Sequence, residues 1–182
     1  MSIGSLLTRF FAHDIDGIQP RIVELKQPMQ IVGMAIDTNI RSVYRDVPAL
    51  GKQFKKYKQR HEIPNTKEPW TFTAVSKDFD KGKGAFSYIM GDIVTSLEEI
   101  PAGLLSFEIP AMTYAVFPVR PKNRFGWPIA IAHAKRHAYE VWLPDSGYES
   151  AGVIDDFEYH DERSVRKSNP EIDLYIAITE KP

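Results

Sequence analysis

The sequence predicts an α+β fold in which a strand-helix-strand-strand module occurs twice around an antiparallel sheet. Two observations predict this fold. An apolar run interrupted by a proline occurs at Ile22–Ile36, where the proline is Pro28, and again at Leu104–Phe117, where it is Pro110. Each run is followed by a proline-led segment of helical periodicity and then by two apolar segments. This repeated order is typical of a duplicated structural unit.

The prolines divide each apolar run into two parts. A proline has no N–H to donate to a neighbouring strand, so Pro28 and Pro110 are expected to break the hydrogen-bond ladder. Each run is therefore expected to form two strand pieces or one bulged strand.

A proline in the first turn marks the beginning of each expected helix. The first N–H groups of a helix have no partner within it, so Pro48 and Pro128 disrupt nothing at that position. The second helix, Ile129–Leu143, is more apolar than the first. We expect it to be buried on more than one side.

Two strand candidates follow each helix. They are Trp70–Lys77 and Ala85–Thr95 in the first half, and Asp156–Asp161 and Ile172–Thr179 in the second. Two such modules paired about a pseudo-two-fold axis would leave a cleft between them, which is a natural place for a ligand.

The domain is expected to span residues 20–182, with modules of about 20–98 and 99–182. An N-terminal extension, residues 1–19, precedes it. Apolar residues at helical spacing over Ser2–His13 predict a short amphipathic helix that docks on its own domain or on another subunit.

Composition restricts the class of protein. With 182 residues, 43% hydrophobic and 26% charged, the chain can form a real core and is not of the disordered type. The net charge of −1 argues against nucleic acid as a direct partner, because phosphate binding needs a concentrated positive face. The densest basic cluster is expected to be a solvated helix face, and consists of Lys52, Lys55, Lys56, Lys58 and Arg60.

The chain contains no cysteine, so disulfides, thiol nucleophiles and cysteine-ligated metals are excluded. No apolar run approaches the ~20 residues that a membrane-spanning helix needs. The N-terminus lacks the positive start of a signal peptide. We expect a cytoplasmic protein that needs no cofactor and no membrane partner.

Glu158 is the main candidate binding residue, because it lies within the apolar strand segment Phe157-Glu158-Tyr159. A buried, unpaired carboxylate costs several kcal/mol, roughly, unless a positive group reaches it. We hypothesise that no protein cation does so, that burial raises the pKa of Glu158, and that an organic cation binds there. The pattern fits equally well with an outward-facing Glu158 on a half-exposed strand.

Aromatic side chains are the expected walls of this pocket, because their ring faces attract cations. Core packing is an equally good explanation for each of them. The candidates are Trp142, Tyr88, Trp70, Phe86, Tyr114 and Tyr148.

Several short motifs occur together in an order that is more specific than any of them alone. They are Val47-Pro48-Ala49-Leu50 with Phe54, Phe86–Gly91, Ile109-Pro110-Ala111 with Tyr114–Phe117, Trp142–Tyr148, Phe157-Glu158-Tyr159 and Ile172–Ile176. Over Pro20–Glu180 the chain thereby resembles the effector-binding domain of AraC-type and MerR-type regulators, also called the gyrase-inhibitor-like domain. More narrowly, it resembles a stand-alone domain of this family carried on an integron gene cassette, similar to one that binds cationic drugs.

The resemblance implies two repeated modules around a ligand cleft. It also implies a glutamate at the position of Glu158 that meets lipophilic cations, with aromatic walls to which Trp142 and Tyr88 correspond. Gly51 departs from the aromatic residue common in relatives, so the pocket is expected to be wider or differently shaped there. The nineteen residues before the domain are too few for a helix-turn-helix unit, so a link to transcription would require a protein partner.

Three other functions stay open. Some relatives are hydrolases, and Glu158 with a raised pKa would suit general acid or base catalysis, although no nucleophile motif accompanies it. His133, His137 and Glu140 have acceptable helical spacing for zinc, but the intervening Lys135 and Arg136 favour a surface explanation. The third function is binding of a protein, as in relatives that inhibit a topoisomerase.

Overall fold

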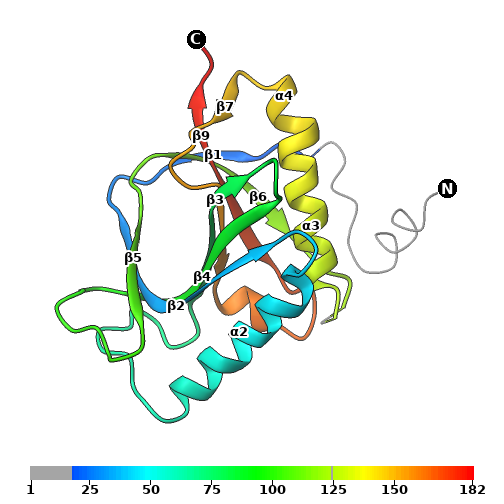
Figure 1. The fold of residues 1–182 in the computed structure, drawn as a ribbon. Helices are drawn as coiled ribbons and strands as arrows, with labels where there is room; N and C mark the ends of the chain where they lie inside the picture. The colour runs from blue at the N-terminus through cyan, green and yellow to red at the C-terminus, as the bar shows by residue number, and fades with distance from the viewer. Residues whose placement is uncertain (1–17, 124) are drawn as a thin grey trace.

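The fold is an antiparallel sheet that carries its two long helices on one face (Figure 1). The structure is a computed structural model of the chain, and it describes residues 18–123 and 125–182. The predicted α+β class with an antiparallel sheet is confirmed. The helix predicted over Ser2–His13 lies outside the described residues. None of the described helices combines the length and apolarity that crossing a membrane requires.

The two proline-interrupted runs form two strands each, as predicted. Pro28 and Pro110 both lie in the gaps between strands. The strands of the first run are β1 (Arg21–Glu24) and β2 (Met29–Asn39), and those of the second are β5 (Leu105–Ile109) and β6 (Thr113–Val119).

The four other predicted strands also form, within three residues of the expected ends. They are β3 (Phe72–Asp80), β4 (Ala85–Val94), β8 (Asp156–His160) and β9 (Ile172–Glu180). A further short strand, β7 (Tyr148–Ser150), pairs with the end of β9 and was not predicted. A 3-10 turn at Glu162–Val165 follows β8.

The order of the strands shows how the two modules meet. It is β1-β6-β9-β8-β3-β4-β2-β5, so β3 of the first module pairs with β8 of the second in the middle of the sheet. The first strand of each module pairs with a strand of the other module: β1 pairs with β6, and β5 pairs with β2. The order is therefore the same when read from either edge, which is what a pseudo-two-fold relation between two modules requires.

The first long helix, α2, spans Val43–Lys58, so Pro48 lies inside it rather than in its first turn. The prediction for this helix start was wrong. The side chain of Asn39 accepts hydrogen bonds from the N–H groups of Arg41 and Ser42, and the hydroxyl of Thr38 donates to Asp46 in the first turn. These bonds start the helix before the proline.

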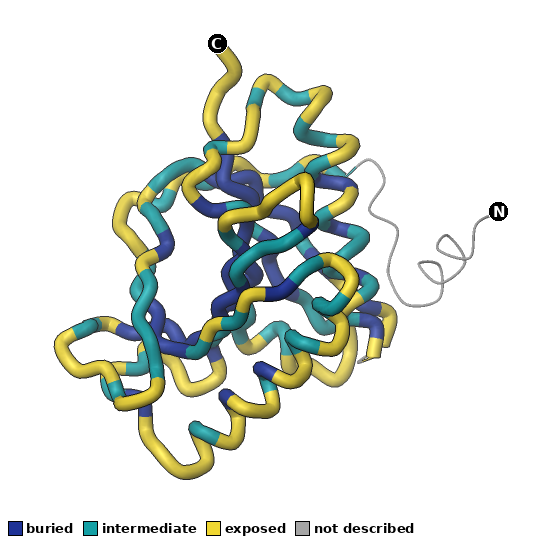
Figure 2. Tube along the Cα trace, in the orientation of Figure 1, coloured by how far each residue is buried: buried dark blue, intermediate teal, exposed yellow. Residues whose placement is uncertain are grey.

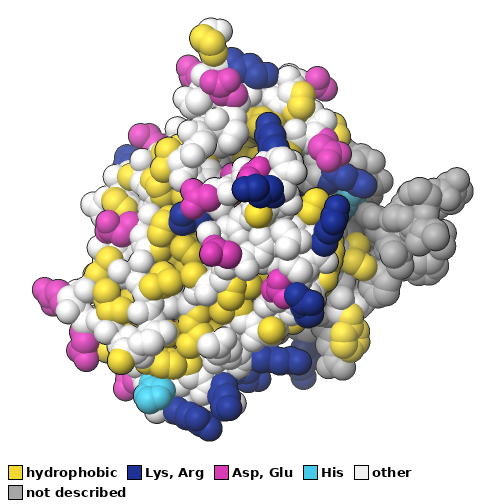
Figure 3. Space-filling model, viewed as in Figure 1, with side chains coloured by type: hydrophobic (Ala, Val, Ile, Leu, Met, Phe, Trp, Pro, Cys, Tyr) yellow, Lys and Arg dark blue, Asp and Glu magenta, His cyan; other side chains and the backbone are white. Residues whose placement is uncertain are grey.

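The exposed side of α2 carries the basic cluster. Lys52, Lys55, Lys56, Lys58 and Arg60 are all exposed, and basic side chains gather along the lower rim of the molecule, over α2 (Figure 3). The opposite side of the helix buries Leu50 and Phe54. The prediction of a solvated face is confirmed.

The second long helix, α3, spans Trp127–His137 and has Pro128 in its first turn, as predicted. The helical path continues through a wider π-type turn at Ala138–Trp142 into α4 (Leu143–Asp145).

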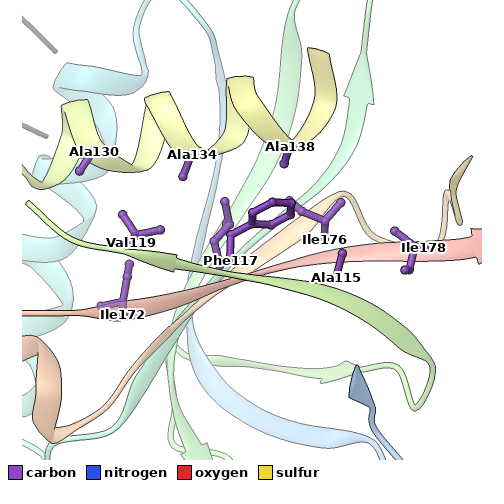
Figure 4. Packing of buried hydrophobic residues seen from close by; sticks show 10 residues of the cluster. Ala115, Phe117, Val119, Ala130, Ala134, Ala138, Ile172, Ile176 and Ile178 are labelled. Atoms are coloured by element: carbon purple, nitrogen blue, oxygen red, sulfur yellow. The ribbon is translucent and has the colours of Figure 1, made fainter. Parts of the chain in front are cut away.

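Small side chains let α3 lie close to the sheet. Ala130, Ala134 and Ala138 repeat at four-residue intervals, and Figure 4 shows them on the underside of the helix, above Phe117 and Ile176 of β6 and β9. All of these side chains are buried. Buried residues concentrate between this helix and the strands, whereas the outer loops are exposed (Figure 2).

Two glycines allow β2 and β4 to approach at the centre of their ladder. Gly33 lies opposite Gly91, and a Cβ built on Gly33 would overlap the carbonyl oxygen of Met90. We expect Gly33→Ala to lower the free energy of unfolding by about 2 kcal/mol or more, because backbone atoms must move apart. Urea denaturation measures this loss.

Gly147→Ala is the matched control, since a Cβ there meets nothing within 4 Å. It should change the free energy of unfolding by less than about 0.5 kcal/mol. Equal stabilities of the two variants would contradict the close approach.

Candidate ligand-binding site

The candidate site is built on β8, the strand of the second module that pairs with β3 in the middle of the sheet. Side chains alternate along a strand, so Asp156, Glu158 and His160 point to one face and Phe157 and Tyr159 to the other. Phe157 belongs to the core on the face away from the helices. The three polar side chains therefore lie under α2 and α3.

Glu158 is buried, with 5% of its surface exposed. Its carboxylate is nonetheless surrounded by polar groups. Nζ of Lys135 lies 3.7 Å from Oε1, Nε2 of His160 lies 3.3 Å from Oε2, and the nearby phenol of Tyr88 also lowers the pKa of the carboxyl. The predicted burial of Glu158 is thus confirmed.

Lys135 comes from α3 and is closer to the neighbouring acid. Its Nζ lies 2.7 Å from Oδ1 of Asp156 and donates a hydrogen bond of 3.1 Å to Oγ of Ser76. Ser76 lies opposite Asp156 in the β3–β8 ladder. Because Ala134 points at the sheet, the next residue on the helix extends sideways, toward these central strands.

The charges of this cluster set its titration. Burial raises the pKa of Glu158, but the hydrogen bond with His160, the charge of Lys135 and the hydrogen bond from Tyr88 together leave it lowered. Burial also raises the pKa of Asp156, and there the charge of Lys135 does not fully offset it. For Lys135, burial lowers the pKa, but the charges of Asp156 and Glu158 outweigh burial and leave it raised.

Two parts of the hypothesis for Glu158 are therefore wrong. The carboxylate does have a protein counter-charge, Lys135, and its pKa is lowered rather than raised. The reason is tertiary: a lysine from a helix and a histidine two residues along the same strand face are brought to it. The cluster still holds two carboxylates against one lysine, so its formal charge remains negative when both acids are ionised and His160 is neutral.

Aromatic rings adjoin the cluster on the same face. Tyr88 is buried, and burial and the nearby charges of Glu158 and Asp156 raise its pKa well above the ordinary value. The ring of Phe72 stacks on His160 with centroids 4.1 Å apart, and the ring of Trp127 lies 6.1 Å from His160. Tyr88 is thus the predicted wall residue that contacts Glu158.

The other predicted wall residues lie at varying places. Phe86 packs beside Tyr88 and Leu50, under α2. Trp70 is half exposed, two residues before Phe72. Tyr114 is fully buried against Phe157, so the structure places it on the opposite face from Glu158.

Trp142 and Tyr148 lie together beyond the end of α3. Their rings stack with centroids 6.0 Å apart, and Trp142 also packs against Phe117. Trp142 follows Lys135 by seven residues, about 10 Å along a helix axis. Tyr148 lines a separate groove of about 780 Å³ between the ends of β1, β6 and β9.

Comparison with known proteins identifies the family. Residues 21–178 match the model of a family described as integron-associated effector-binding proteins. The chain belongs to this family. That description agrees with the resemblance stated from the motifs, and it names effector binding as the property of the group.

Individual relatives of this effector-binding protein include a regulator and several solved structures. The transcriptional regulator BrlR of Pseudomonas aeruginosa is 30% identical over 170 residues, which are 90% of this chain and 57% of the regulator. The chain thus spans little more than half of that relative. An integron cassette protein of Vibrio cholerae shares the fold with a TM-score of 0.59, at 15% identity, over 88% of this chain and 96% of that one.

A second solved structure was determined with a ligand bound. SAV2435 bound to tetraphenylphosphonium matches with a TM-score of 0.65, at 11% identity, over 89% of this chain and 94% of that one. The regulator EcmrR, solved in a DNA complex, matches at a TM-score of 0.57 and 13% identity over 90% of this chain and 58% of its own. At such identities these structures support the fold alone.

Sequence reasoning did not assign Lys135, Asp156 or His160 to the candidate site. Asp156 and His160 share the period-two pattern of Glu158, so alternation along β8 could have grouped them. Lys135 follows Ile131 by four residues, which puts both on the same side of a helix. This spacing indicates an inward-facing cation less clearly than the strand alternation indicates Asp156 and His160.

The arrangement limits the chemistry available to this effector-binding protein. Ser76 and Lys135 are in contact, but the raised pKa of Lys135 keeps the amine protonated, so it cannot act as a base toward the serine. Of the proposed zinc ligands, His137 is buried beside Phe117 whereas Glu140 is exposed. Within the described residues, no three His, Cys, Asp or Glu side chains are grouped to hold a metal.

The lowered pKa of Glu158 leads to a titration experiment. NMR of the carboxyl carbons measures the pKa of each acid. The pKa of Glu158 should lie below the ordinary glutamate range, and that of Asp156 above the ordinary aspartate range. A lowered pKa in the folded state means that Glu158 stabilises the fold above its unfolded pKa, and that this contribution is lost as pH falls through the folded value.

Lys135→Met should raise the midpoint of Glu158, because burial is then opposed by fewer groups. A midpoint of Glu158 that is unchanged in this variant would contradict the role of Lys135 as its counter-charge.

Proposed function

We propose that this effector-binding protein binds lipophilic organic cations, with Glu158 as the group that meets the positive charge. The observation that carries the proposal is the excess of acid in a buried place: among the residues that the structure describes, Lys135 is the one lysine or arginine paired with Asp156 and Glu158, and His160 is a further contact of Glu158. Its position supports the proposal, because β3 and β8 are where the two modules join and both long helices lie over that face. Tetraphenylphosphonium, the ligand bound to one structural neighbour, is a compound of this class.

The magnitudes favour a cation that carries apolar surface. A charge about 4 Å from a carboxylate gains about 4 kcal/mol at an effective dielectric constant of ~20. A small hydrated cation loses as much or more on leaving water, whereas a cation whose charge is surrounded by apolar groups loses less. Contact with aromatic rings adds roughly 0.5–2 kcal/mol. Tyr88, Phe72 and Trp127 are rings that adjoin this cluster.

Broad selectivity follows from these interactions. Neither the charge of Glu158 nor the ring faces specify the shape of a ligand, and the two methionines near α2, Met34 and Met90, have side chains that adapt to different shapes. Gly51 lies against the side chain of Met90, where an added Cβ would be in ordinary contact with its methyl and sulfur. We infer that this side of the site accommodates ligands of varied size.

Replacement of Glu158 tests the proposal directly. Glu158→Gln should weaken tetraphenylphosphonium binding at least tenfold, about 1.4 kcal/mol, because the amide carries no charge but has the same shape. Isothermal titration calorimetry at neutral pH measures the affinity. Glu149→Gln, at an exposed position of β7, is the matched control and should bind like the original chain. Equal affinities of the two variants would remove Glu158 from the site.

A pair of probes of equal shape and opposite charge tests the selectivity. Tetraphenylphosphonium at about 100 times its dissociation constant should stabilise the fold by about 2.7 kcal/mol, which raises the melting temperature by several degrees. Tetraphenylborate should leave the melting temperature unchanged, because its negative charge is repelled by Asp156 and Glu158. Thermal unfolding measures both, and equal shifts would show that apolar surface alone drives binding.

A further inference from the structure

We propose that Lys135 is a resident cation that competes with the ligand for Glu158, and that Asp156 is the positioning residue that holds Lys135 aside when the ligand binds. This inference rests on the proposed function, and it adds how the site selects among cations. It is carried by the unequal contacts of one lysine with two carboxylates.

The contacts of Lys135 are asymmetric. Its Nζ is 2.7 Å from Asp156 and 3.1 Å from the hydroxyl oxygen of Ser76, but 3.7 Å from Glu158. Two groups therefore hold the ammonium on the Asp156 side, and a weaker contact extends to Glu158. Loss of the weaker contact alone would leave Lys135 with an ion pair and a hydrogen bond.

The backbone of α3 need not move for this exchange. The helix is fixed through Ala134 and Ala138, which are buried against the sheet on either side of Lys135 in the sequence. The ammonium of a lysine sits on a flexible four-carbon stem, so it can shift by about an ångström without a change in the helix. Such a shift is enough to separate it from Glu158.

A tethered cation acts as a selectivity filter. Lys135 is always present beside Glu158, so a small hydrated cation must compete with it while also losing its water. A lipophilic cation has a further source of free energy, its apolar contacts with the surrounding rings, and can replace the weaker contact. Competition from Lys135 thus favours cations that carry apolar surface.

The other helix offers a contrast within the same fold. Lys58 of α2 forms an ion pair with Asp92, which is 2% exposed, and this pair has one acid for one lysine. While Lys58 keeps its partner Asp92, this pair has no second carboxylate that a ligand could meet. The second carboxylate at Lys135 is what allows exchange.

Other groups at the cluster do not duplicate this role. Tyr88 lies near Glu158 and lowers the pKa of its carboxyl, and Nε2 of His160 lies 3.3 Å from Oε2. Asp155 adds negative charge that acts on Lys135, and the hydroxyl of Tyr139 lies 3.4 Å from Asp156. Among the described groups at the cluster, Lys135 is the one that contacts both carboxylates.

A double-mutant cycle tests the exchange, with calorimetric titration of tetraphenylphosphonium as the readout. Lys135→Met should bind about tenfold more tightly than the original chain, because the competitor is gone. Asp156→Asn should bind at least about tenfold more weakly, because Lys135 then pairs with Glu158 alone. In the Asp156→Asn background, Lys135→Met should increase affinity by at least about tenfold more than it does in the original background.

The difference between the two gains from Lys135→Met distinguishes direct competition at Glu158 from a long-range effect of the lysine charge. If Lys135 acted only through long-range charge, its removal would give the same gain in both backgrounds, and the proposal would be overturned. Arg136→Met is the matched control, because it removes an exposed positive charge from the next position of α3. A gain from Arg136→Met as large as that from Lys135→Met would also overturn it.

The outcomes distinguish this inference from the proposed function. If the original chain does not bind tetraphenylphosphonium, or if Glu158→Gln binds equally well, the proposed function fails. If Glu158→Gln weakens binding but the gains from Lys135→Met are equal in both backgrounds, only the exchange fails. Circular dichroism reports the folding of each variant. Should Lys135→Met not fold, Asp156→Asn retains the lysine, and unchanged affinity in that variant still overturns the proposal.

Discussion

One lysine shared between two buried carboxylates is the interaction on which the functional interpretation of this protein depends. A buried acid must be compensated, and Lys135 compensates Asp156 and Glu158 together but only partly. The cluster is therefore compatible with a folded, ligand-free protein, and its excess of acid is the basis of the cation binding that we propose. A fully paired site would hold no excess charge, and an unpaired one would cost more than a small domain can easily offset.

The pseudo-symmetric fold places this cluster where it is. Pairing of β3 with β8 brings Ser76 opposite Asp156 and Ala74 opposite Glu158, so a small side chain leaves room beside the acid. The buried alanines of α3 set its height above the sheet, and that height lets Lys135 reach the central strands. Exchange of the outer strands β1 and β5 ties each module to the other. The charged groups of the site come from the second module, and Ser76 and Phe72 of the first module contact them across the junction.

Membership of the integron-associated effector-binding family and the geometry of the cluster support each other, but they contribute different things. The family match makes effector binding the common theme. The cluster supplies a reason for a positive ligand, because acids outnumber lysines at a buried position. The expected lack of a counter-charge at Glu158 was wrong, and its correction is informative: Lys135 is a resident cation beside Glu158, which is why we propose competition between cations rather than an empty negative site.

The sequence by itself determined the features that depend on neighbouring residues. Pro28 and Pro110 interrupt strands wherever they occur, Pro128 begins a helix, and alternation along β8 puts Glu158 and Phe157 on opposite faces. Only the tertiary structure decided which groups meet. Tyr114 was expected beside Glu158 but lies on the other face, and Lys135 reaches Glu158 from a helix more than twenty residues away in the chain. Local steric rules act over a few residues, whereas the pairing of charges depends on how separate elements pack, which no local pattern records.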